Sequence, residues 1–282
     1  MTTRILYDTH MHTRLCKHAR GEPEDYAARA YEIGLKGIIF TCHNPGPKGW
    51  DERIRMSLDQ FQDYVGLVRR ASEVWNGRLD VRLGLECDYV PGMEPFLEKL
   101  LAFKGLEYVL GSVHPHASYY RSKYYKGDIT AFNCTYFHHL AQAAESGLFD
   151  TISHPDIVKT VYPNDWDPFG IWNDILKALD RIAKTNVAME LNTSGLLKNI
   201  KEMNPNMHML VAMAERGIPI VVGSDAHSPQ RVGANFDLAL NMLEEAGYTH
   251  IHFFLDRQRQ QLALDRARDS LNLPTRPRQP NW

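Results

Sequence analysis

Short apolar segments rich in β-branched residues alternate with amphipathic segments along nearly all of this 282-residue chain. We expect strands over residues 4–9, 37–41, 80–87, 108–112, 150–153, 187–191, 219–223 and 250–255. Apolar residues spaced three and four apart predict helices over residues 27–33, 61–75, 93–103, 132–146, 170–184, 207–216, 236–246 and 257–271. Near-continuous apolar strands that alternate with helices indicate a parallel sheet that is covered on both faces.

The number of these units favours a closed barrel. About eight strand–helix units in one domain-sized chain suit a (β/α) barrel better than a doubly wound sheet. No Gly-x-Gly-x-x-Gly motif follows the first expected strand, which also argues against a dinucleotide-binding fold. We find no linker inside the chain. We therefore expect a single barrel domain over residues 1–271 and a C-terminal tail over residues 272–282, which holds three prolines and two arginines.

Composition excludes several other classes of protein. The chain is 44% hydrophobic and 23% charged, as soluble globular domains are. Its 32 Lys and Arg residues nearly balance 34 Asp and Glu residues, so charge gives no reason to expect a long nucleic acid or a membrane surface as partner. No apolar run approaches the roughly 20 residues of a membrane-spanning helix. The 4 cysteines are too few for a disulfide framework, so we expect reduced thiols and a cytoplasmic location.

Many of the 13 histidines fall where the expected strands end, which is the face at which a barrel keeps its chemistry. The candidate metal ligands at these ends and in the first loop are His10, His12, His18, His43, Glu86, His114, His154, Asp225 and His227. This set exceeds the about three protein ligands of a mononuclear catalytic site. Imidazole and carboxylate suit Zn, Fe or Mn. We therefore predict two or three divalent transition metals, with Glu86 and Asp225 as candidate bridging carboxylates.

Six motifs occur in a fixed order: DTHMHT (8–13), GLECDY (84–89), GSVH (111–114), SHPD (153–156), ELNTSGL (190–196) and GSDAH (223–227). In order and spacing they resemble the polymerase-and-histidinol-phosphatase (PHP) family over nearly the whole chain. Within that family the chain looks like the stand-alone histidinol-phosphate phosphatases. The resemblance implies an α/β fold, a distorted (β/α)7 TIM-like barrel of the PHP type, with a trinuclear metal centre at the strand ends.

The resemblance also implies a distribution of the ligands among three metals. One metal would take His10, His12, Glu86 and Asp225, a second would take Glu86, His114 and His154, and a third would take His18, His43 and His227.

Loops after the expected strands supply candidates for binding the substrate. These are His116, Arg121, Lys123, Lys159, Asn192 and Lys198. The cations among them suit a phosphate dianion, because charge-assisted hydrogen bonds to phosphate are strong. Pro115 and His116 after His114, and Leu197 before Lys198, depart from the pattern that we expect of histidinol phosphatases. These departures leave the specificity for the amino alcohol open.

Together these features predict a metal-dependent phosphomonoesterase. A metal-activated hydroxide would attack the phosphorus of a small ester, with L-histidinol phosphate as the leading candidate. Glu86, Asp225 and His227 are the expected catalytic residues. The leaving alkoxide would take its proton from Asp225, from His227 or from a metal-bound water, and the sequence does not choose among them.

Three other functions stay open. An amidohydrolase-like enzyme would use a similar His-x-His strand to cleave C–N bonds, but such enzymes often carry a lysine after the fourth strand, where this chain has His114. A nuclease or nucleotide phosphodiesterase would use the same metals, although the balanced charge argues against long nucleic acids. A non-catalytic regulatory barrel would be expected to have lost ligands. The sequence does not indicate an oligomeric state.

Overall fold

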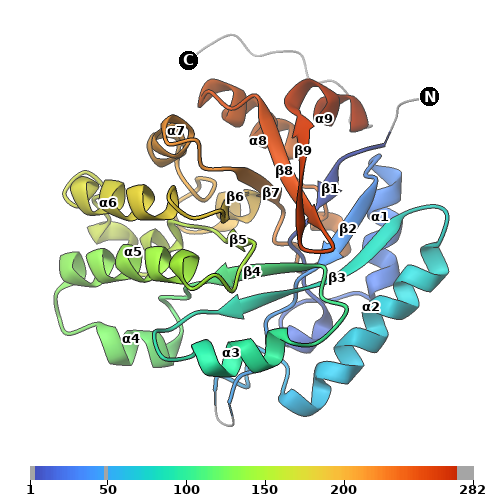
Figure 1. Ribbon diagram of the computed structural model, residues 1–282, viewed down its shortest axis with the longest axis horizontal. Coiled ribbons are helices and arrows are strands. Elements are labelled where there is room, and N and C mark those ends of the chain that lie inside the picture. Colours follow the sequence, from blue (N-terminus) through green and yellow to red (C-terminus); the bar gives the residue numbers. More distant parts are fainter. Residues whose placement is uncertain (1–3, 48–49, 272–282) are drawn as a thin grey trace.

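A computed structural model describes residues 4–47 and 50–271 of the chain (Figure 1). Within these residues one sheet of 9 strands runs in chain order. Its strands are β1 (Tyr7–Asp8), β2 (Gly37–Phe40), β3 (Asp80–Asp88), β4 (Tyr108–Ser112), β5 (Thr151–Ile152), β6 (Ala188–Asn192), β7 (Ile220–Gly223), β8 (His250–Leu255) and β9 (Gln258–Ala263). Each strand from β1 to β8 is parallel to the one before it, and β9 is antiparallel to β8.

Helices connect the strands and cover the outside of the sheet. They are α1 (Pro23–Glu32), α2 (Phe61–Trp75), α3 (Glu94–Leu101), α4 (Ser118–Tyr124), α5 (Ile129–Glu145), α6 (Trp172–Ile182), α7 (Met207–Glu215), α8 (Phe236–Glu245) and α9 (Leu264–Ser270). The apolar spacing explains their packing. In α6, for example, Ile175, Ala178, Leu179 and Ile182 form the buried stripe. Strands β2, β4, β6 and β7 are buried along their whole length, as a sheet covered on both faces requires.

The first and seventh strands meet beyond their carboxyl ends. Met11 and Ala226 form an isolated parallel bridge. The N–H of His12 donates to the Ala226 carbonyl at 2.9 Å, and the N–H of Ala226 donates to the His10 carbonyl at 3.1 Å. This contact joins the segments that follow β1 and β7. With the mostly parallel sheet, it agrees with the expected α/β fold, a distorted TIM-like barrel of the PHP type.

The expected helix over residues 257–271 is wrong in its first half. Residues Gln258–Ala263 form β9, and only Leu264–Ser270 are helical. Asp256 and Arg257 have φ of 51° and 61°, both in the left-handed region, as the two central residues of a tight hairpin turn need. The turn folds β9 back on β8. The backbone of β9 therefore forms hydrogen bonds with β8, in place of the bonds within one segment that a helix would form.

The β8–β9 hairpin covers the end of the barrel opposite to the metal ligands. Phe254 stacks on Tyr108 with ring centroids 5.4 Å apart, and both belong to a small inner apolar cluster. At the turn, the Arg257 guanidinium pairs with the Asp150 carboxylate, Nε to Oδ2, at 2.5 Å. The Arg257 N–H donates to the Glu107 carbonyl at 2.9 Å. Because Glu107 and Asp150 directly precede β4 and β5, the hairpin lies across the amino ends of these strands.

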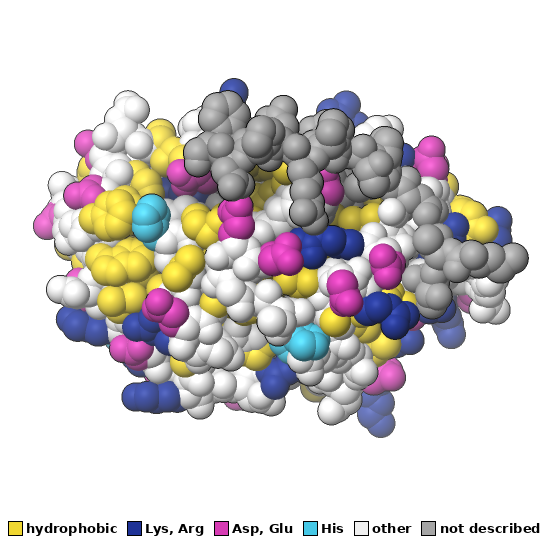
Figure 2. Space-filling model, turned by 90° about the horizontal axis from the view of Figure 1, so that it is seen from above, with side chains coloured by type: hydrophobic (Ala, Val, Ile, Leu, Met, Phe, Trp, Pro, Cys, Tyr) yellow, Lys and Arg dark blue, Asp and Glu magenta, His cyan; other side chains and the backbone are white. Residues whose placement is uncertain are grey.

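On the surface, charges of both signs are interspersed on the face drawn in Figure 2, and no basic stripe runs across the part that is coloured there. Among residues 4–47 and 50–271, none of the helices combines the length and the apolar character that crossing a membrane requires. The expected tail, 272–282, lies outside the described residues.

Candidate metal centre

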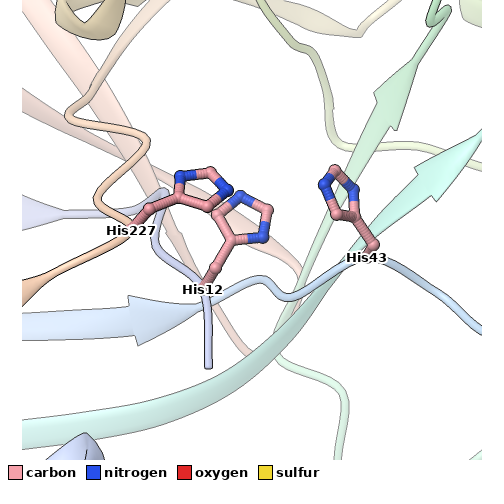
Figure 3. A group of neighbouring side chains, drawn as sticks. All are labelled: His12, His43 and His227. Carbon is pink, nitrogen blue, oxygen red and sulfur yellow. The ribbon is translucent and has the colours of Figure 1, made fainter. Parts of the chain in front are cut away.

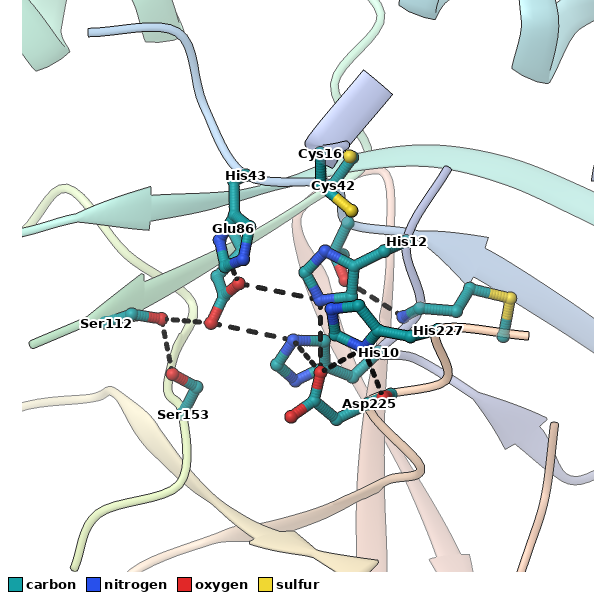
Figure 4. A network of polar contacts seen from close by, with 12 residues as sticks. His10, His12, Cys16, Cys42, His43, Glu86, Ser112, Ser153, Asp225 and His227 are labelled. Atoms are coloured by element: carbon teal, nitrogen blue, oxygen red, sulfur yellow. Dashed lines mark hydrogen bonds and ion pairs between the residues drawn. The ribbon is translucent and has the colours of Figure 1, made fainter. Parts of the chain in front are cut away.

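The predicted ligands come together at the carboxyl ends of the strands, where Glu86 occupies the middle (Figure 4). The Glu86 side chain is buried near the end of β3. Its Oε2 lies 2.7 Å from His43 Nδ1, and its Oε1 lies 2.9 Å from His154 Nε2. His114 Nε2 and His10 Nε2 lie 3.5 Å and 3.6 Å from the same Oε1. One carboxylate therefore faces four imidazoles from four different strand ends.

Asp225 organises the other side of the cluster. Its Oδ1 lies 3.1 Å from His12 Nε2 and 3.6 Å from His10 Nε2. The rings of His12 and His227 stack with centroids 4.0 Å apart, and His43 approaches the same space from the end of β2 (Figure 3). His18, which follows the 3-10 helix η1 (Arg14–Cys16), places its Nε2 2.9 Å from His227 Nε2.

The arrangement fits metal ions, because it leaves buried donor atoms without hydrogen bonds. Among the described residues, His10 Nε2, His12 Nε2, His43 Nδ1 and Glu86 Oε2 approach charged neighbours but make no hydrogen bond of good geometry. Buried polar groups nearly always make such bonds, so donor atoms that face one another without them fit a site for a cation. The pKa of Glu86 reflects the same chemistry: burial raises it, but His43, His10 and His114 bring it well below its usual value. The carboxylate is therefore ionised, as a metal ligand must be.

Among the described residues, five groups of three His, Cys or Glu side chains have their ligand atoms within 4.8 Å of one another, and three of these groups consist of predicted ligands alone. These three are His10, His12 and Glu86; His43, Glu86 and His114; and His12, His43 and His227. The first two sets agree in part with the implied first and second metals. In the implied third set, His18 and His227 are adjacent, whereas His43 Nδ1 lies against Glu86 Oε2 at 2.7 Å. The structure thus places His43 between two of the implied metal positions.

Two buried carboxylates that were not predicted as site residues hold the ligand imidazoles in place. Glu190 Oε1 accepts from His10 Nδ1 at 2.7 Å, and Asp88 Oδ1 accepts from His114 Nδ1 at 2.6 Å. A hydrogen bond to one ring nitrogen turns the other toward the metal. Strand alternation could have identified Asp88, because it lies two residues beyond Glu86 and so shares its side of the strand.

Asp88 is itself held by a fully buried arginine. Arg55 Nη2 donates to Asp88 Oδ2 at 2.6 Å, and the Tyr119 hydroxyl donates to the same oxygen. Burial raises the pKa of Asp88, but Arg55 and His114 bring it well below its usual value. The Trp50 ring lies against Tyr119, with ring centroids 3.9 Å apart and the ring planes tilted by 33°.

The backbone is strained at two of the ligands. His154 and Asp225 have φ of 25° and 49°. Such conformations in residues other than glycine cost about 1–3 kcal/mol and persist only where the surroundings enforce them. The His154 N–H donates to Glu190 Oε2 at 2.9 Å, and the Ser194 hydroxyl donates to Asp225 Oδ2 at 2.9 Å. These bonds fix the two turns that aim the ligands inward.

Gly223 is required beside the cluster for a steric reason. A Cβ atom at this position would lie 2.0 Å from Glu190 Oε1 and 2.7 Å from His10 Cβ. Only glycine leaves room for the contact between His10 and Glu190.

A cavity of about 270 Å³ opens over the ligands. Its lining includes nine of the residues that were predicted for metal or substrate, namely His18, His43, Glu86, His114, His116, His154, Lys198, Asp225 and His227. Arg231, which the sequence analysis did not select, also lines it. Arg231 lies only four residues after the GSDAH motif, in the loop after β7. This position is the sequence feature that could have identified it as a cavity residue.

The other predicted substrate residues do not line this cavity. Arg121 and Lys123 are exposed on α4, a helix that turns Tyr120 inward and these cations outward. Lys159 is fully buried, and its Nζ donates to Asp156 Oδ2 at 3.0 Å and to the Met203 carbonyl at 2.9 Å. Asn192 is also buried, and its side-chain amide donates to Glu190 at 3.0 Å. The partners of Lys159 and Asn192 are thus inside the protein.

A barrel that gathers imidazoles around a buried, shared carboxylate at its strand ends has the architecture of a metal-dependent hydrolase. Comparison with known proteins makes the assignment specific. The PHP domain model matches residues 8–194, and the PHP-associated model matches residues 204–235. The chain therefore belongs to the PHP family.

Individual relatives agree with this assignment. A probable histidinol-phosphatase from Deinococcus radiodurans is 40% identical over 254 residues, which cover 88% of this chain and 96% of the relative. The histidinol-phosphatase of Bacillus subtilis is 26% identical over 83% of this chain and 97% of its own. The fold is similar to the crystal structure of histidinol phosphate phosphatase from Lactococcus lactis, complexed with Zn, L-histidinol and phosphate. The TM-score is 0.75 at 17% identity, over 90% of this chain and 98% of that one.

Proposed function

We propose that this chain is a metal-dependent phosphomonoesterase whose substrate is L-histidinol phosphate or a closely similar small phosphate ester. The observation that carries the proposal is the Glu86 carboxylate, which lies within 3.6 Å of nitrogens from four imidazoles beneath an open cavity. The names of the Deinococcus and Bacillus relatives, and the histidinol and phosphate bound by the Lactococcus enzyme, support the same substrate class.

We infer that two or three divalent ions, Zn, Fe or Mn, bind at the predicted ligands. When bound, such ions supply a hydroxide nucleophile at neutral pH and neutralise charge on the phosphoryl oxygens. Glu86 and Asp225 contribute negative charge that offsets the ions. The supporting carboxylates Glu190 and Asp88 keep His10 and His114 in the tautomers that present Nε2 to the cluster.

Asp225 and His227 are the candidate proton donors to the leaving alkoxide, because both line the cavity. His227 Nδ1 donates to the Asp225 carbonyl at 2.9 Å, which leaves Nε2 as its reactive atom. Burial and the neighbouring His12 lower the pKa of His227 to about 2. Its imidazole is therefore neutral at pH 7, as a ligand must be. Burial raises the pKa of Asp225, but His10, His12 and His227 bring it well below its usual value, so this carboxylate is ionised as well. We infer that a solvent molecule is the better source of the proton.

His116 and Lys198 are the predicted substrate residues that line the cavity, and we propose that they contact the ester. Both are exposed, so they can adjust to a bound molecule. A single domain over residues 1–271 stays a prediction, which the bridge between Met11 and Ala226 supports.

The test is a substrate screen on protein reconstituted with Zn, Mn or Fe. Release of inorganic phosphate from L-histidinol phosphate and from p-nitrophenyl phosphate is measured beside cleavage of bis(p-nitrophenyl) phosphate and of an amide. We expect the monoesters to react far faster than the diester or the amide. Elemental analysis of the same sample should give two or three metal equivalents.

Glu86→Gln should abolish turnover and lower the metal content, because it removes the charge shared by four imidazoles. Glu73→Gln is the matched control, since Glu73 is exposed on α2 with 72% of its side chain accessible. Metal-loaded protein that cleaves the diester or the amide but no monoester would refute the phosphatase assignment and leave the metal centre intact.

A further inference from the structure

Arg231 is a cation in the cavity with an unused donor. It ends the 3-10 helix η6 (Pro229–Arg231), which follows β7 and the ligands Asp225 and His227. Its Nη2 is buried and has no hydrogen-bond partner in the described part of the chain. No carboxylate among residues 4–47 and 50–271 lies within ion-pair distance of its guanidinium. The acidic residues that line the same cavity, Glu86 and Asp225, face the imidazoles.

The backbone that carries Arg231 is held on both sides. Before it, Pro229 packs so closely on Gly21 that a Cβ atom there would lie 2.7 Å from Pro229 Cγ. The Arg231 N–H donates to the Ser228 carbonyl at 3.0 Å. After it, the Gly233 N–H donates to the buried carboxylate of Asp8 at 2.9 Å. The base of the arginine side chain is thus fixed before any ligand binds.

A buried guanidinium nitrogen without a partner is unfavourable, and an anion from outside the protein would satisfy it. Guanidinium groups match the geometry of phosphoryl oxygens and can donate two parallel hydrogen bonds to them. Lys198 is the other permanent cation in the lining, but it is exposed on a flexible stem. Arg231 therefore combines charge, a buried donor atom and a fixed backbone position, whereas Lys198 is exposed.

We propose that Arg231 binds the phosphoryl group of the substrate and so makes the site selective for a phosphate dianion. The proposal rests on the phosphatase function proposed above and assigns to it a residue of the loop after β7. Arg231 is a ligand for substrate and not for metal, so its loss should weaken the binding of phosphate while the metal content stays the same.

The test compares wild-type protein with Arg231→Gln and Arg231→Lys, each loaded with metal and analysed for metal content. Arg20→Gln is the control, because Arg20 is an exposed arginine outside the cavity lining. Two readouts are used. Calorimetry gives the Kd of inorganic phosphate, and steady-state kinetics gives kcat and KM for p-nitrophenyl phosphate.

For Arg231→Gln we expect a Kd for phosphate and a KM that rise roughly 10- to 100-fold, the usual effect of losing one charge-assisted hydrogen bond. Arg231→Lys should recover part of this loss, and Arg20→Gln should match wild type. Unchanged Kd and KM in metal-loaded Arg231→Gln would overturn the proposal. A raised KM with an unchanged Kd for phosphate would also overturn it, since the contact would then be to the leaving group. Failure of the phosphatase function itself would appear differently, as wild-type protein that hydrolyses no monoester.

Discussion

The histidines predicted as metal ligands use their two ring nitrogens differently. For four of them the partner of Nδ1 is a fixed oxygen within the protein, namely Glu190 for His10, Asp88 for His114, the Cys16 carbonyl for His18 and the Asp225 carbonyl for His227. Each ring is thereby held in the tautomer that leaves Nε2 free. The hydrogen bonds to Nδ1 differ in strength, because two of the acceptors are charged carboxylates and two are neutral carbonyls.

The substitution Asp88→Asn tests the role of a charged hydrogen-bond partner, here the carboxylate that binds Nδ1 of His114. The change keeps the shape but removes the charge that Arg55, Tyr119 and His114 share. We expect metal affinity or kcat to fall about 10- to 100-fold, as is usual when such a partner is lost. Metal titration and steady-state kinetics measure the two effects. Asp256→Asn is the control, because Asp256 lies at the hairpin turn with 82% of its side chain exposed. Equal behaviour of both variants would refute the role of Asp88.

At the scale of elements, helices α4 and α5 are joined beside the site by a buried histidine. The Tyr120 hydroxyl donates to His139 Nδ1 at 2.7 Å, and His139 is only 6% exposed. Burial, together with His138 and Lys123, lowers the pKa of His139 to about 4. The folded protein therefore holds this imidazole neutral, whereas the unfolded chain protonates it near pH 6.5.

This difference predicts a loss of stability in acid. Between pH 6.5 and pH 4 the unfolded chain binds a proton at His139 that the folded protein does not, so stability is full above this window and falls as the pH is lowered through it. At pH 5 the loss from this one residue is about 2 kcal/mol. Urea unfolding at pH 7.5 and pH 5 measures it, and His139→Gln should lack this share of the pH dependence. His208→Gln, at an exposed position on α7, should keep it. A pH dependence identical in all three proteins would disprove the assignment.

Elements that depend on local spacing were predictable, and those that depend on a partner were not. The strand β3 and the helix α2 lie where their apolar patterns put them. The segment 258–263 has few apolar residues, and its strand exists because β8 offers hydrogen bonds across a turn. Helix α4 was likewise missed, since the tyrosines at 119 and 120 gave no helical period within so short a segment.

For the whole molecule, the clustering of the predicted ligands could be expected because parallel strands of a barrel end on one face. A residue such as Glu86 can therefore be assigned to the site from its position in a strand. The substrate residues could not be assigned in this way. Lys159 follows β5 as a binding residue would, but Asp156 and Met203 hold its amino group inside the protein. Such pairings depend on tertiary packing, which the sequence pattern does not contain.

Removal of metal should destabilise the entire barrel. The ligands His10 and His12 lie near one end of the chain, and Asp225 and His227 lie near the other, on strands that meet at Met11 and Ala226. Metal at 100 times its Kd stabilises the folded state by about 2.7 kcal/mol. We therefore expect chelator-treated protein to have a lower Tm by calorimetry, and stoichiometric Zn to restore it. Glu86→Gln should show a much smaller shift, and equal Tm values with and without metal would contradict a structural contribution.

The bridge between Met11 and Ala226 also bears on how the protein is made. During synthesis the histidines near the start of the chain leave the ribosome long before Asp225 and His227, and a domain generally folds as a unit. A nascent chain can hold only part of the ligand set until the loop after β7 has emerged and paired with the first strand. The complete set of predicted ligands therefore exists only after the end of the chain has reached its start.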